Sequence, residues 1–391
     1  MQSTPFPVSP QSLAAAFADV PDPRRAASVE HPLAAILALA VAALLTGRRS
    51  VLAMAEWGAL QAPTMLAALG FPAMSSPCQS TLHRVFRRLD GEALAAVLRA
   101  HIAPVAMPAD GLQGVALDGK AHRGRLRFDA PGGPVHALSA VCHESGLVLA
   151  HAPIAATGDK AAVELTVAPV VVAHLSWRGR VLTGDALFCQ RELCRQVCAA
   201  GGDYALLVKA NQPALHDAIA LLFDPPADLH ALPLLDQRAA QTCERGHGRT
   251  DDCRCLIAST DLTAYLEWPH LAQVFRLERT WAERGTSHRT VHYGITSLSP
   301  KRADAATVLA LRRGHWTIEN QVHRHKDVNL GEDASLIHLD HGPMTLALLR
   351  DAALNLLHGA GVRQIAARLR RHAQRPEEAV ALVLNPLPTH A

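Results

Sequence analysis

A segment near the C-terminal end of the chain, GHWTIENQVHRHKD at residues 314–327, surrounds one carboxylate with cationic or titratable side chains. The carboxylate belongs to Glu319, and its neighbours include His315, His323, Arg324, His325 and Lys326. Two interpretations fit this composition. The segment is either a solvated surface patch of ion pairs, or it offers a carboxylate to metal ions and flanking groups to phosphates.

Helical spacing would gather part of this segment on one face, because each residue of an α-helix turns by 100°. The side chains within about 80° of one another are His315, Glu319, His323 and Lys326. Ile318 and Val322 lie beside that face, which predicts that one edge of the helix is buried. Glu319 would then stand at the border of the core, although a solvated amphipathic helix gives the same pattern.

Two further carboxylates, Asp118 and Asp185, stand where apolar strands are expected to end, in GVALDGK and GRVLTGDALF. Strand ends are where α/β proteins tend to build their sites. Either aspartate alone would more often be a turn former or a helix cap. Small neighbours, Gly119 and Gly184, would let a backbone or a phosphate approach closely, and Lys120 follows directly.

Three carboxylates from separate segments suit a pair of Mg²⁺ or Mn²⁺ ions, because these hard cations prefer oxygen ligands. Two such ions can activate a water or a 3′-hydroxyl and stabilise the leaving oxygen of a phosphodiester. Neighbouring Lys and His side chains would hold the phosphates. The rival acids Asp327, Glu332 and Asp333 rank below Glu319, because NLGED should end the helix.

The segment from 113 to 212 is expected to hold the elements that position the aspartates. Its pattern predicts the order β-β-β-α-β-α-β, which gives a mixed sheet with helices on its faces. From about 213 to 300 the alternation stops, and three strands near 251–260, 272–281 and 289–298 indicate a β-rich insertion. Helices resume after it, ending in a basic amphipathic helix at 362–378.

Residues 12 to 102 read as helices. One of them begins near Ser80 or Thr81 and carries Arg84, Arg87 and Arg88 away from its apolar face. That helix is either a recognition helix of a small DNA-binding unit or a solvated basic face.

Bulk composition sets outer limits. The chain has 391 residues, 49% of them hydrophobic, and a net charge of +3, so an acidic partner must bind to local patches. The longest apolar run, at 33–45, is shorter than the roughly 20 residues that cross a bilayer, which predicts a buried helix and a cytoplasmic protein. The eight cysteines show no disulfide framework; reduced core cysteines are favoured over a zinc site at Cys189, Cys194 and Cys198.

Several segments together resemble the DDE transposases of bacterial insertion sequences, specifically the H-repeat-associated branch. In the main domain these are LDGKAHRG, LTGDALF, YALLVKANQ, YGITSLSP and HWTIENQVHRHKDVNLGEDAS; near the N-terminus they are DPRR, HPLAAILALAVAALLTG, AEWG and STLHRVFRRLD. The resemblance implies an RNase H-like core with a β-rich insertion between the second Asp and the Glu. It also implies Asp118, Asp185 and Glu319 as the metal-binding triad.

The expected architecture is therefore α/β: an RNase H-like mixed sheet with flanking helices, a β-rich insertion and an all-helical N-terminal domain. The expected division is 1–105 (helical, DNA-binding or associated), 106–212 (first part of the core), 213–300 (insertion), 301–360 (second part, carrying Glu319) and 361–391 (basic tail).

The segment around Glu319 departs from related transposases, which carry Tyr-x₂-Arg-x₃-Glu-x₆-Lys there. Lys326 keeps its spacing, but His315 stands at the arginine position and Arg312 at the tyrosine position. A histidine binds phosphate when protonated or through a neutral N–H, so this grip should weaken as the pH rises. The hairpin route that accompanies this motif elsewhere is left open.

The residues expected to contact DNA are Lys120, Lys209, Asn211, Arg312, His315, His323 and Lys326. Lys209 and Asn211 follow the fifth strand, where an ordinary turn is the alternative. His247 and Arg249, in the Gly-rich segment ERGHGRTDD, are weaker candidates for a phosphate contact, and His122 and Arg123 lie close after Asp118.

These observations predict a cytoplasmic, nucleoid-associated DNA transposase that uses two Mg²⁺ or Mn²⁺ ions. It would hydrolyse the DNA at the element's ends and join the 3′-hydroxyl to target DNA, as a homodimer that pairs the two ends. Two alternatives stay open: a DNA-binding protein that has lost catalysis, and a stand-alone RNase H-like nuclease.

Overall fold

The computed structural model describes residues 8–106, 111–121, 136–154, 160–226, 235–246, 249–283 and 286–388. The chain forms two compact units, each built from segments that are far apart in the sequence. The first unit is drawn from Met1–Met107, Gly119–Asp159 and Thr317–Ala391, and the second from Pro108–Asp118 and Lys160–Trp316. The expected five-part division of the chain stays a prediction.

The N-terminal part of the first unit is helical, as predicted. Its elements are α1 (Leu13–Ala16), η1 (Phe17–Asp19), η2 (Ala26–Ser28), α2 (Leu33–Leu45), α3 (Val51–Ala59), α4 (Pro63–Ala68), α5 (Gln79–Arg88) and α6 (Gly91–Ile102). Helix α2 is apolar on every side and almost wholly buried, which confirms the predicted buried helix. Among the described residues, no helix is long and apolar enough to span a membrane.

The basic helix α5 begins two or three residues earlier than its sequence indicates, because Cys78 rather than Ser80 or Thr81 is the N-cap. Its apolar face is buried, and Arg84 and Arg88 are exposed. Arg87 forms an ion pair with Asp340, 2.6 Å from nitrogen to oxygen. Whether α5 binds DNA stays a prediction.

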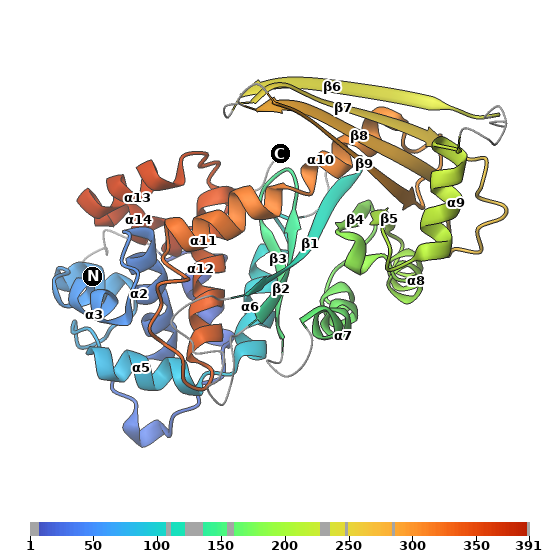
Figure 1. Ribbon diagram of the computed structural model, residues 1–391. Coiled ribbons are helices and arrows are strands. Elements are labelled where there is room, and N and C mark those ends of the chain that lie inside the picture. The colour runs from blue at the N-terminus through green and yellow to red at the C-terminus, as the bar shows by residue number, and fades with distance from the viewer. Residues whose placement is uncertain are drawn as a thin grey trace. The chain divides into compact units, whose positions relative to one another are not determined.

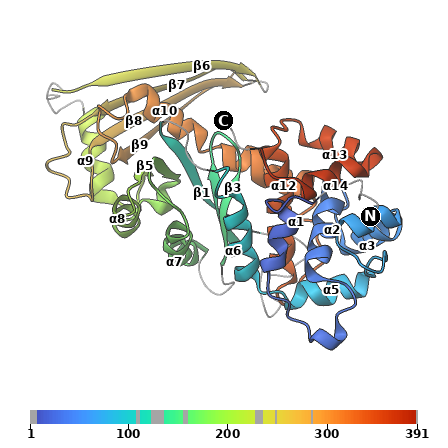
Figure 2. The ribbon, with the colours of Figure 1, turned by 180° about the vertical axis from the view of Figure 1, so that it is seen from behind.

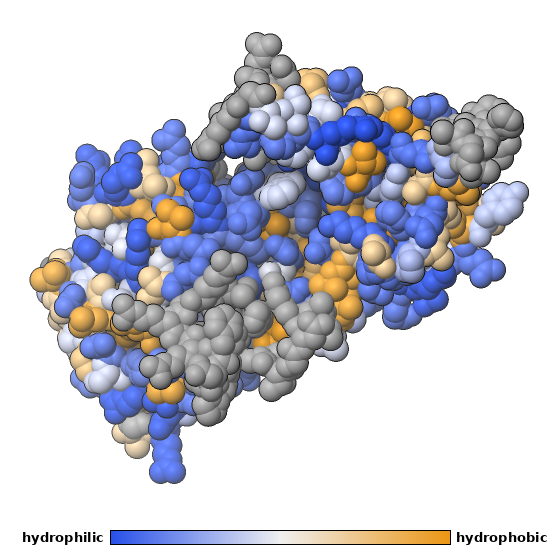
Figure 3. All heavy atoms as spheres, viewed as in Figure 1, coloured by the Kyte–Doolittle hydropathy of each residue, from blue (hydrophilic) through white to orange (hydrophobic). Residues whose placement is uncertain are grey.

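Helix α12 (Gly342–Gly359) is the central element of the first unit. It packs against α2, α5 and α6, and also against β3 (Val148–Ile154), which forms an antiparallel hairpin with β2 (His136–Cys142) (Figures 1 and 2). The expected basic tail is two packed helices, α13 (Ile365–Gln374) and α14 (Pro376–Leu384). Hydrophilic residues gather on the surface over α13 (Figure 3), while Ile365 and Leu369 are buried.

The second unit is built on parallel strands. Strand β1 (Gln113–Ala121) pairs with β4 (Arg180–Gly184), and β4 pairs with β5 (Asp203–Val208). Between these strands the chain forms α7 (Lys160–Ala173), η3 (Ala186–Phe188) and α8 (Arg191–Ala199). The predicted order of strands and helices is confirmed, including the end of α8 at Gly201, whose φ of +83° suits glycine.

The insertion extends the sheet of the second unit. Its strands β6 (Arg238–Gly246), β7 (Arg249–Ser259), β8 (Gln273–Glu283) and β9 (Thr286–Thr296) are antiparallel, and β9 pairs with β5. The prediction of three strands missed β6, whose sequence RAAQTCERG has few β-formers, and also missed helix α9 (Pro213–Phe223). The predicted fold class, a mixed sheet with helices and a β-rich insertion, is confirmed.

The segment around Glu319 is not the single regular α-helix that its spacing suggested. Helix α10 (Ala305–Gly314) ends before it, and a π-helical turn, η4 (Ile318–His323), leads into α11 (Arg324–Val328). Ile318 and Val322 are buried, as predicted. A π-turn fits one extra residue into a helical turn and is frequent at functional sites.

The cysteines only partly follow the prediction. Cys142, Cys189 and Cys194 are buried free thiols, as expected for core cysteines. Cys243 and Cys253, however, face each other across β6 and β7 and form a disulfide. The expectation of reduced cysteines is wrong for this pair, because hairpin formation brings together two residues that the sequence separates.

Candidate metal and DNA site

Asp118 and Asp185 belong to two neighbouring segments of the second unit: Asp118 lies within β1, and Asp185 directly follows the last residue of β4. The last residues that β1 and β4 pair are Ala116 and Thr183, so each aspartate comes two residues after this pair. Neighbouring strands lie about 4.8 Å apart, and residues two apart share a face of the sheet. Asp118 is half-buried and Asp185 is exposed. Strand β1 runs on to Ala121, beyond the predicted end at Asp118.

The Asp185 carboxylate is held by the backbone that follows it. One of its oxygens accepts a hydrogen bond from the Leu187 N–H at 2.9 Å, so Asp185 caps η3. Gly184 is tightly packed, because a Cβ there would lie 3.1 Å from the Cβ of Phe188 and 3.4 Å from Leu206. The expected close approach of a phosphate at this glycine stays a prediction.

Arg312 lies beneath Asp185 and does not present its charge to solvent. Its guanidinium donates to the carbonyl oxygens of Gly184 at 3.1 Å and Ala205 at 3.0 Å, and the residue is 6% exposed. Burial lowers the pKa of Arg312 to about 10, against the opposing attraction of Asp185. As folded, this side chain fastens α10 to β4 and β5, and the expected DNA contact at Arg312 stays a prediction.

Three more of the expected DNA contacts lie near this end of the second unit. His315 is half-buried, with its Nδ1 3.3 Å from the Thr183 hydroxyl. Lys209 is exposed after β5. Asn211 is also exposed, but its amide donates to the Ala186 carbonyl at 2.6 Å, so it braces the turn after Asp185. Among the residues expected to contact DNA in this unit, Lys209 is exposed and His315 is partly exposed, as a DNA contact would require.

Glu319 lies in the first unit, exposed on the π-turn. Its Oε2 is 3.3 Å from Nδ1 of His323, one turn further along. The imidazole of His323 is nearly inaccessible, since the residue is 4% exposed. His323 therefore contacts the Glu319 carboxylate from a buried position. Its expected contact with a phosphate stays a prediction.

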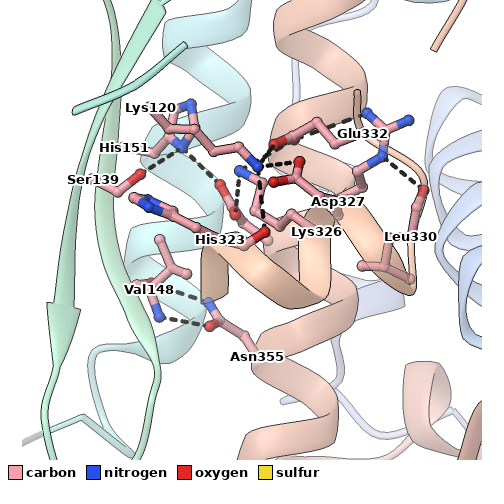
Figure 4. Close-up of polar contacts among 12 residues, drawn as sticks. Lys120, Ser139, Val148, His151, His323, Lys326, Asp327, Leu330, Glu332 and Asn355 are labelled. Carbon is pink, nitrogen blue, oxygen red and sulfur yellow. Dashed lines mark hydrogen bonds and ion pairs between the residues drawn. The ribbon is translucent and has the colours of Figure 1, made fainter. Parts of the chain in front are cut away.

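Lys120 and Lys326 are buried as well, at 9% and 1% exposure. Lys120 donates to the His323 carbonyl at 3.3 Å and pairs with Asp327 and with Glu332, the latter at 3.2 Å. Lys326 pairs with Asp351 at 2.9 Å and with Glu332 at 3.3 Å (Figure 4). Both lysines were expected to hold phosphate; the structure places them in buried ion pairs, and their expected DNA contacts stay predictions.

The ion pairs continue across the first unit (Figure 4). Arg350 donates to the Leu330 carbonyl at 3.2 Å, and His151 lies 2.8 Å from Asp351. Burial opposes the charge on Lys326, but Asp351 and Glu332 outweigh it, so the pKa of Lys326 is raised. Burial likewise opposes the charge on Asp351, yet Lys326 and His151 hold its pKa below the usual value.

Sequence reasoning missed this cluster, which we call the buried charge network and define as Lys120, His151, Lys326, Asp327, Glu332, Arg350 and Asp351. A signal for it was present. Arg350 and Asp351 interrupt the apolar helix LALLRDAALNLL, and charges on a helix that is buried all round must be paired. His122, Arg123 and His247 lie outside the described residues.

Comparison with known families bears on what these side chains do. A family model described as "Transposase DDE domain" matches residues 112–356, and a model of the DDE transposase-associated segment matches residues 14–102. The chain belongs to the DDE transposase family. Asp118, Asp185 and Glu319 all fall inside the matched region. Together with the mixed sheet, family membership confirms the predicted RNase H-like fold class.

Several proteins of similar sequence align with most of the chain. A protein from the dhlA 3′ region of Xanthobacter autotrophicus is 34% identical over 67% of this chain and 86% of its own length. The "Putative transposase YncI" of Escherichia coli O157:H7 is 28% identical over 90% of this chain and 88% of its own. The "H repeat-associated putative transposase YhhI" of Escherichia coli (strain K12) is 25% identical over 86% and 88%.

Among solved structures, a cryo-EM structure of the piggyBac transposase synaptic complex with hairpin DNA covers 97% of this chain and 83% of its own. Its TM-score is 0.41 and its sequence identity 9%. The similarity to H-repeat-associated proteins of Escherichia coli confirms the branch expected from the sequence.

Proposed function

We propose that the protein is a DNA transposase that hydrolyses phosphodiester bonds at the ends of an insertion sequence and joins the freed 3′-hydroxyl to target DNA. The observation that carries this proposal is the parallel pairing of β1, which carries Asp118, with β4, which Asp185 directly follows, inside a region that matches the transposase DDE domain. Both carboxylates come just after the residues that β1 and β4 pair, and α/β proteins tend to build their sites at the carboxyl ends of parallel strands.

Asp118, Asp185 and Glu319 are the proposed metal ligands. The donor set fits Mg²⁺ or Mn²⁺, because it consists of carboxylates on exposed or half-buried side chains. A pair of such ions, when bound, would activate the attacking oxygen and stabilise the leaving one. The chain's own contribution is orientation: Leu187 N–H holds Asp185, and His323 holds Glu319.

Lys209 and His315 are proposed to contact DNA phosphates, because they keep accessible polar groups on the unit that carries both aspartates. Phosphate contacts position DNA without reading its sequence. We further propose that the active form is a homodimer that pairs two DNA ends, and that the protein acts in the cytoplasm at the nucleoid.

The test is a nicking assay with the short inverted repeats expected beside the gene, in Mg²⁺ and at fixed salt. The wild-type protein should cut at the repeat ends, and Asp118→Asn, Asp185→Asn and Glu319→Gln should each lower the rate at least 100-fold, on the order found when essential groups are lost. Glu377→Gln, at an exposed glutamate on α14, is the matched control and should cut normally.

The same substrates separate the alternatives. Specific binding to the ends without cleavage by the wild type would favour a DNA-binding protein that has lost catalysis. Cleavage without joining, when pre-cleaved ends and a plasmid are supplied, would favour a stand-alone nuclease. Normal cleavage by any of the three carboxylate variants would remove that residue from the proposed site.

A further inference from the structure

Lys326 stands where the transposase motif places a phosphate-binding lysine, yet its surroundings do not suit a phosphate. The ammonium group lies 2.9 Å from Asp351 and 3.3 Å from Glu332, and the residue is almost completely buried. Glu332 and Asp351 are themselves buried. A DNA phosphate would have to enter the protein interior and displace two carboxylates that already neutralise this charge.

The buried charge network joins elements of the first unit that are distant in the sequence. Lys120 comes from β1, Lys326 and Asp327 from α11, Glu332 from the loop that follows it, and Arg350 and Asp351 from α12 (Figure 4). Three cations face three carboxylates, so the network is balanced, and His151 from β3 adds a polar partner to Asp351. Balance of this kind is what allows charges to be buried.

The network brackets the π-turn that carries Glu319. Lys120 donates to the His323 carbonyl at the last residue of η4. Lys326 anchors the next helix, α11, to Asp351 on α12. Since η4 and α11 are continuous, a shift of either anchor would move the π-turn. His323 in turn contacts the Glu319 carboxylate through its Nδ1 at 3.3 Å, so a shift of the π-turn would also move Glu319.

We propose that Lys326 is a positioning residue: by pairing with Asp351 and Glu332 inside the fold, it fixes the π-turn that aims Glu319, and it does not bind DNA. This inference rests on the proposed function, because it assigns Glu319 a place in the metal site. It predicts that losing Lys326 impairs the cutting step and the response to metal, while DNA binding is preserved.

The experiment uses a double variant, because Lys326→Met alone removes one buried cation from Asp351 and Glu332, leaves the network with an excess of negative charge and could prevent folding. Lys326→Met/Asp351→Asn removes one charge of each sign and keeps the network balanced. Lys301→Met is the matched control at an exposed lysine, and Lys209→Met is the comparison for a proposed phosphate contact. Folding is checked by circular dichroism for each protein.

Three measurements follow on inverted-repeat DNA: affinity across a salt series, cleavage rate at saturating DNA, and the Mn²⁺ concentration that gives half the maximal rate. We expect the double variant to bind DNA within about 2-fold of wild type with an unchanged salt slope. Its cleavage rate should fall by about 10- to 100-fold, since small misplacements cost this much. The half-maximal Mn²⁺ concentration should rise. Lys209→Met should instead lower the salt slope by about 1.

A drop in salt slope for the double variant, matching that of Lys209→Met, would make Lys326 a phosphate ligand and overturn the inference. An unchanged cleavage rate and metal response would overturn it too. If wild type itself does not cut, the proposed function fails separately. Hydrogen exchange then still tests the positioning role: exchange over residues 318–328 should quicken in the double variant, and unchanged exchange there would refute it.

Discussion

Asn355 makes a clamp on the edge of the β2–β3 hairpin. Its side-chain oxygen accepts from the Val148 N–H at 2.8 Å, and its side-chain nitrogen donates to the Val148 carbonyl at 3.0 Å (Figure 4). Asn355 lies on α12 one turn after Asp351, so this clamp fastens β3 to the helix that anchors the buried charge network. We predict that Asn355→Leu destabilises the first unit although leucine has a similar size.

The magnitude follows from the two hydrogen bonds. Both are of ordinary length and buried, since Asn355 is 5% exposed and Val148 is 4% exposed. Each backbone group left without a partner costs about 1–3 kcal/mol. The leucine variant recovers part of this free energy, because its side chain has no polar amide group to be removed from water on folding. The expected net loss in the free energy of unfolding is about 2–4 kcal/mol.

Urea unfolding and hydrogen exchange measure this loss at two scales. The midpoint in urea should fall for Asn355→Leu, and the Val148 amide should exchange roughly 30- to 1,000-fold faster, because about 1.4 kcal/mol corresponds to a factor of ten. Asn385→Leu is the matched control: it makes the same change at an exposed position and should stay within about 0.5 kcal/mol of wild type.

Asn355→Asp separates hydrogen bonding from packing, because the two side chains have nearly the same shape. At neutral pH the aspartate is ionised and turns an acceptor towards the Val148 carbonyl, so the variant should be at least as unstable as Asn355→Leu. Protonation at low pH restores a donor, so this deficit should narrow as the pH falls. If both variants unfold like wild type and Val148 exchanges at the wild-type rate, the clamp does not hold the hairpin.

Three further predictions follow from the geometry. Because the pKa of Asp351 is lowered and that of Lys326 is raised, their ion pair stabilises the fold over the pH range in which both groups are charged. This stabilisation is lost as the pH falls below about 3.8 or rises above about 10.5. Outside that range the urea midpoint should fall less steeply with pH in Lys326→Met/Asp351→Asn than in wild type, and equal slopes would contradict the pairing. Gly294→Ala should lower the free energy of unfolding by about 1–3 kcal/mol or more, because its Cβ would meet the Phe275 ring and lie 2.6 Å from the Leu206 carbonyl; an unchanged urea midpoint would show that the sheet yields there. EDTA should abolish end nicking and added Mn²⁺ or Mg²⁺ should restore it, so nicking that persists in EDTA would argue against metal ligation by the carboxylates.

Much of the fold was predictable because hydrophobic patterning is local. The patterns at 113–118 and 180–184, with alternation of strands and helices between them, placed Asp118 on a strand and Asp185 directly after one, although β1 runs on to Ala121 instead of ending at Asp118. Strand β6 escaped prediction because its sequence has few β-formers, and it is paired along most of its length with β7. Helix α9 was missed although PALHDAIALLF contains helix formers and begins with a proline. Tertiary pairing decides such segments.

The DNA contacts were the least predictable part of the site, because a cation's sequence position does not reveal where its charge points. Lys120, Arg312 and Lys326 were expected to hold phosphate, and all three are buried against carbonyls or carboxylates. The π-turn added a second difference, since it changes the phase between Glu319 and Lys326 from that of a regular α-helix.

The sequence alone determined the residue types, the order of strands and helices, and the three acids that suit divalent metal ions. These features depend on side-chain chemistry and short-range periodicity. Only the tertiary structure decided which cations remain accessible. Lys209 stays in solvent, whereas Lys326 finds Asp351, 25 positions away in the chain, and is neutralised inside the fold. The physical reason is that burying a charge requires a partner of opposite sign, and that partner is supplied by packing rather than by neighbours in the chain.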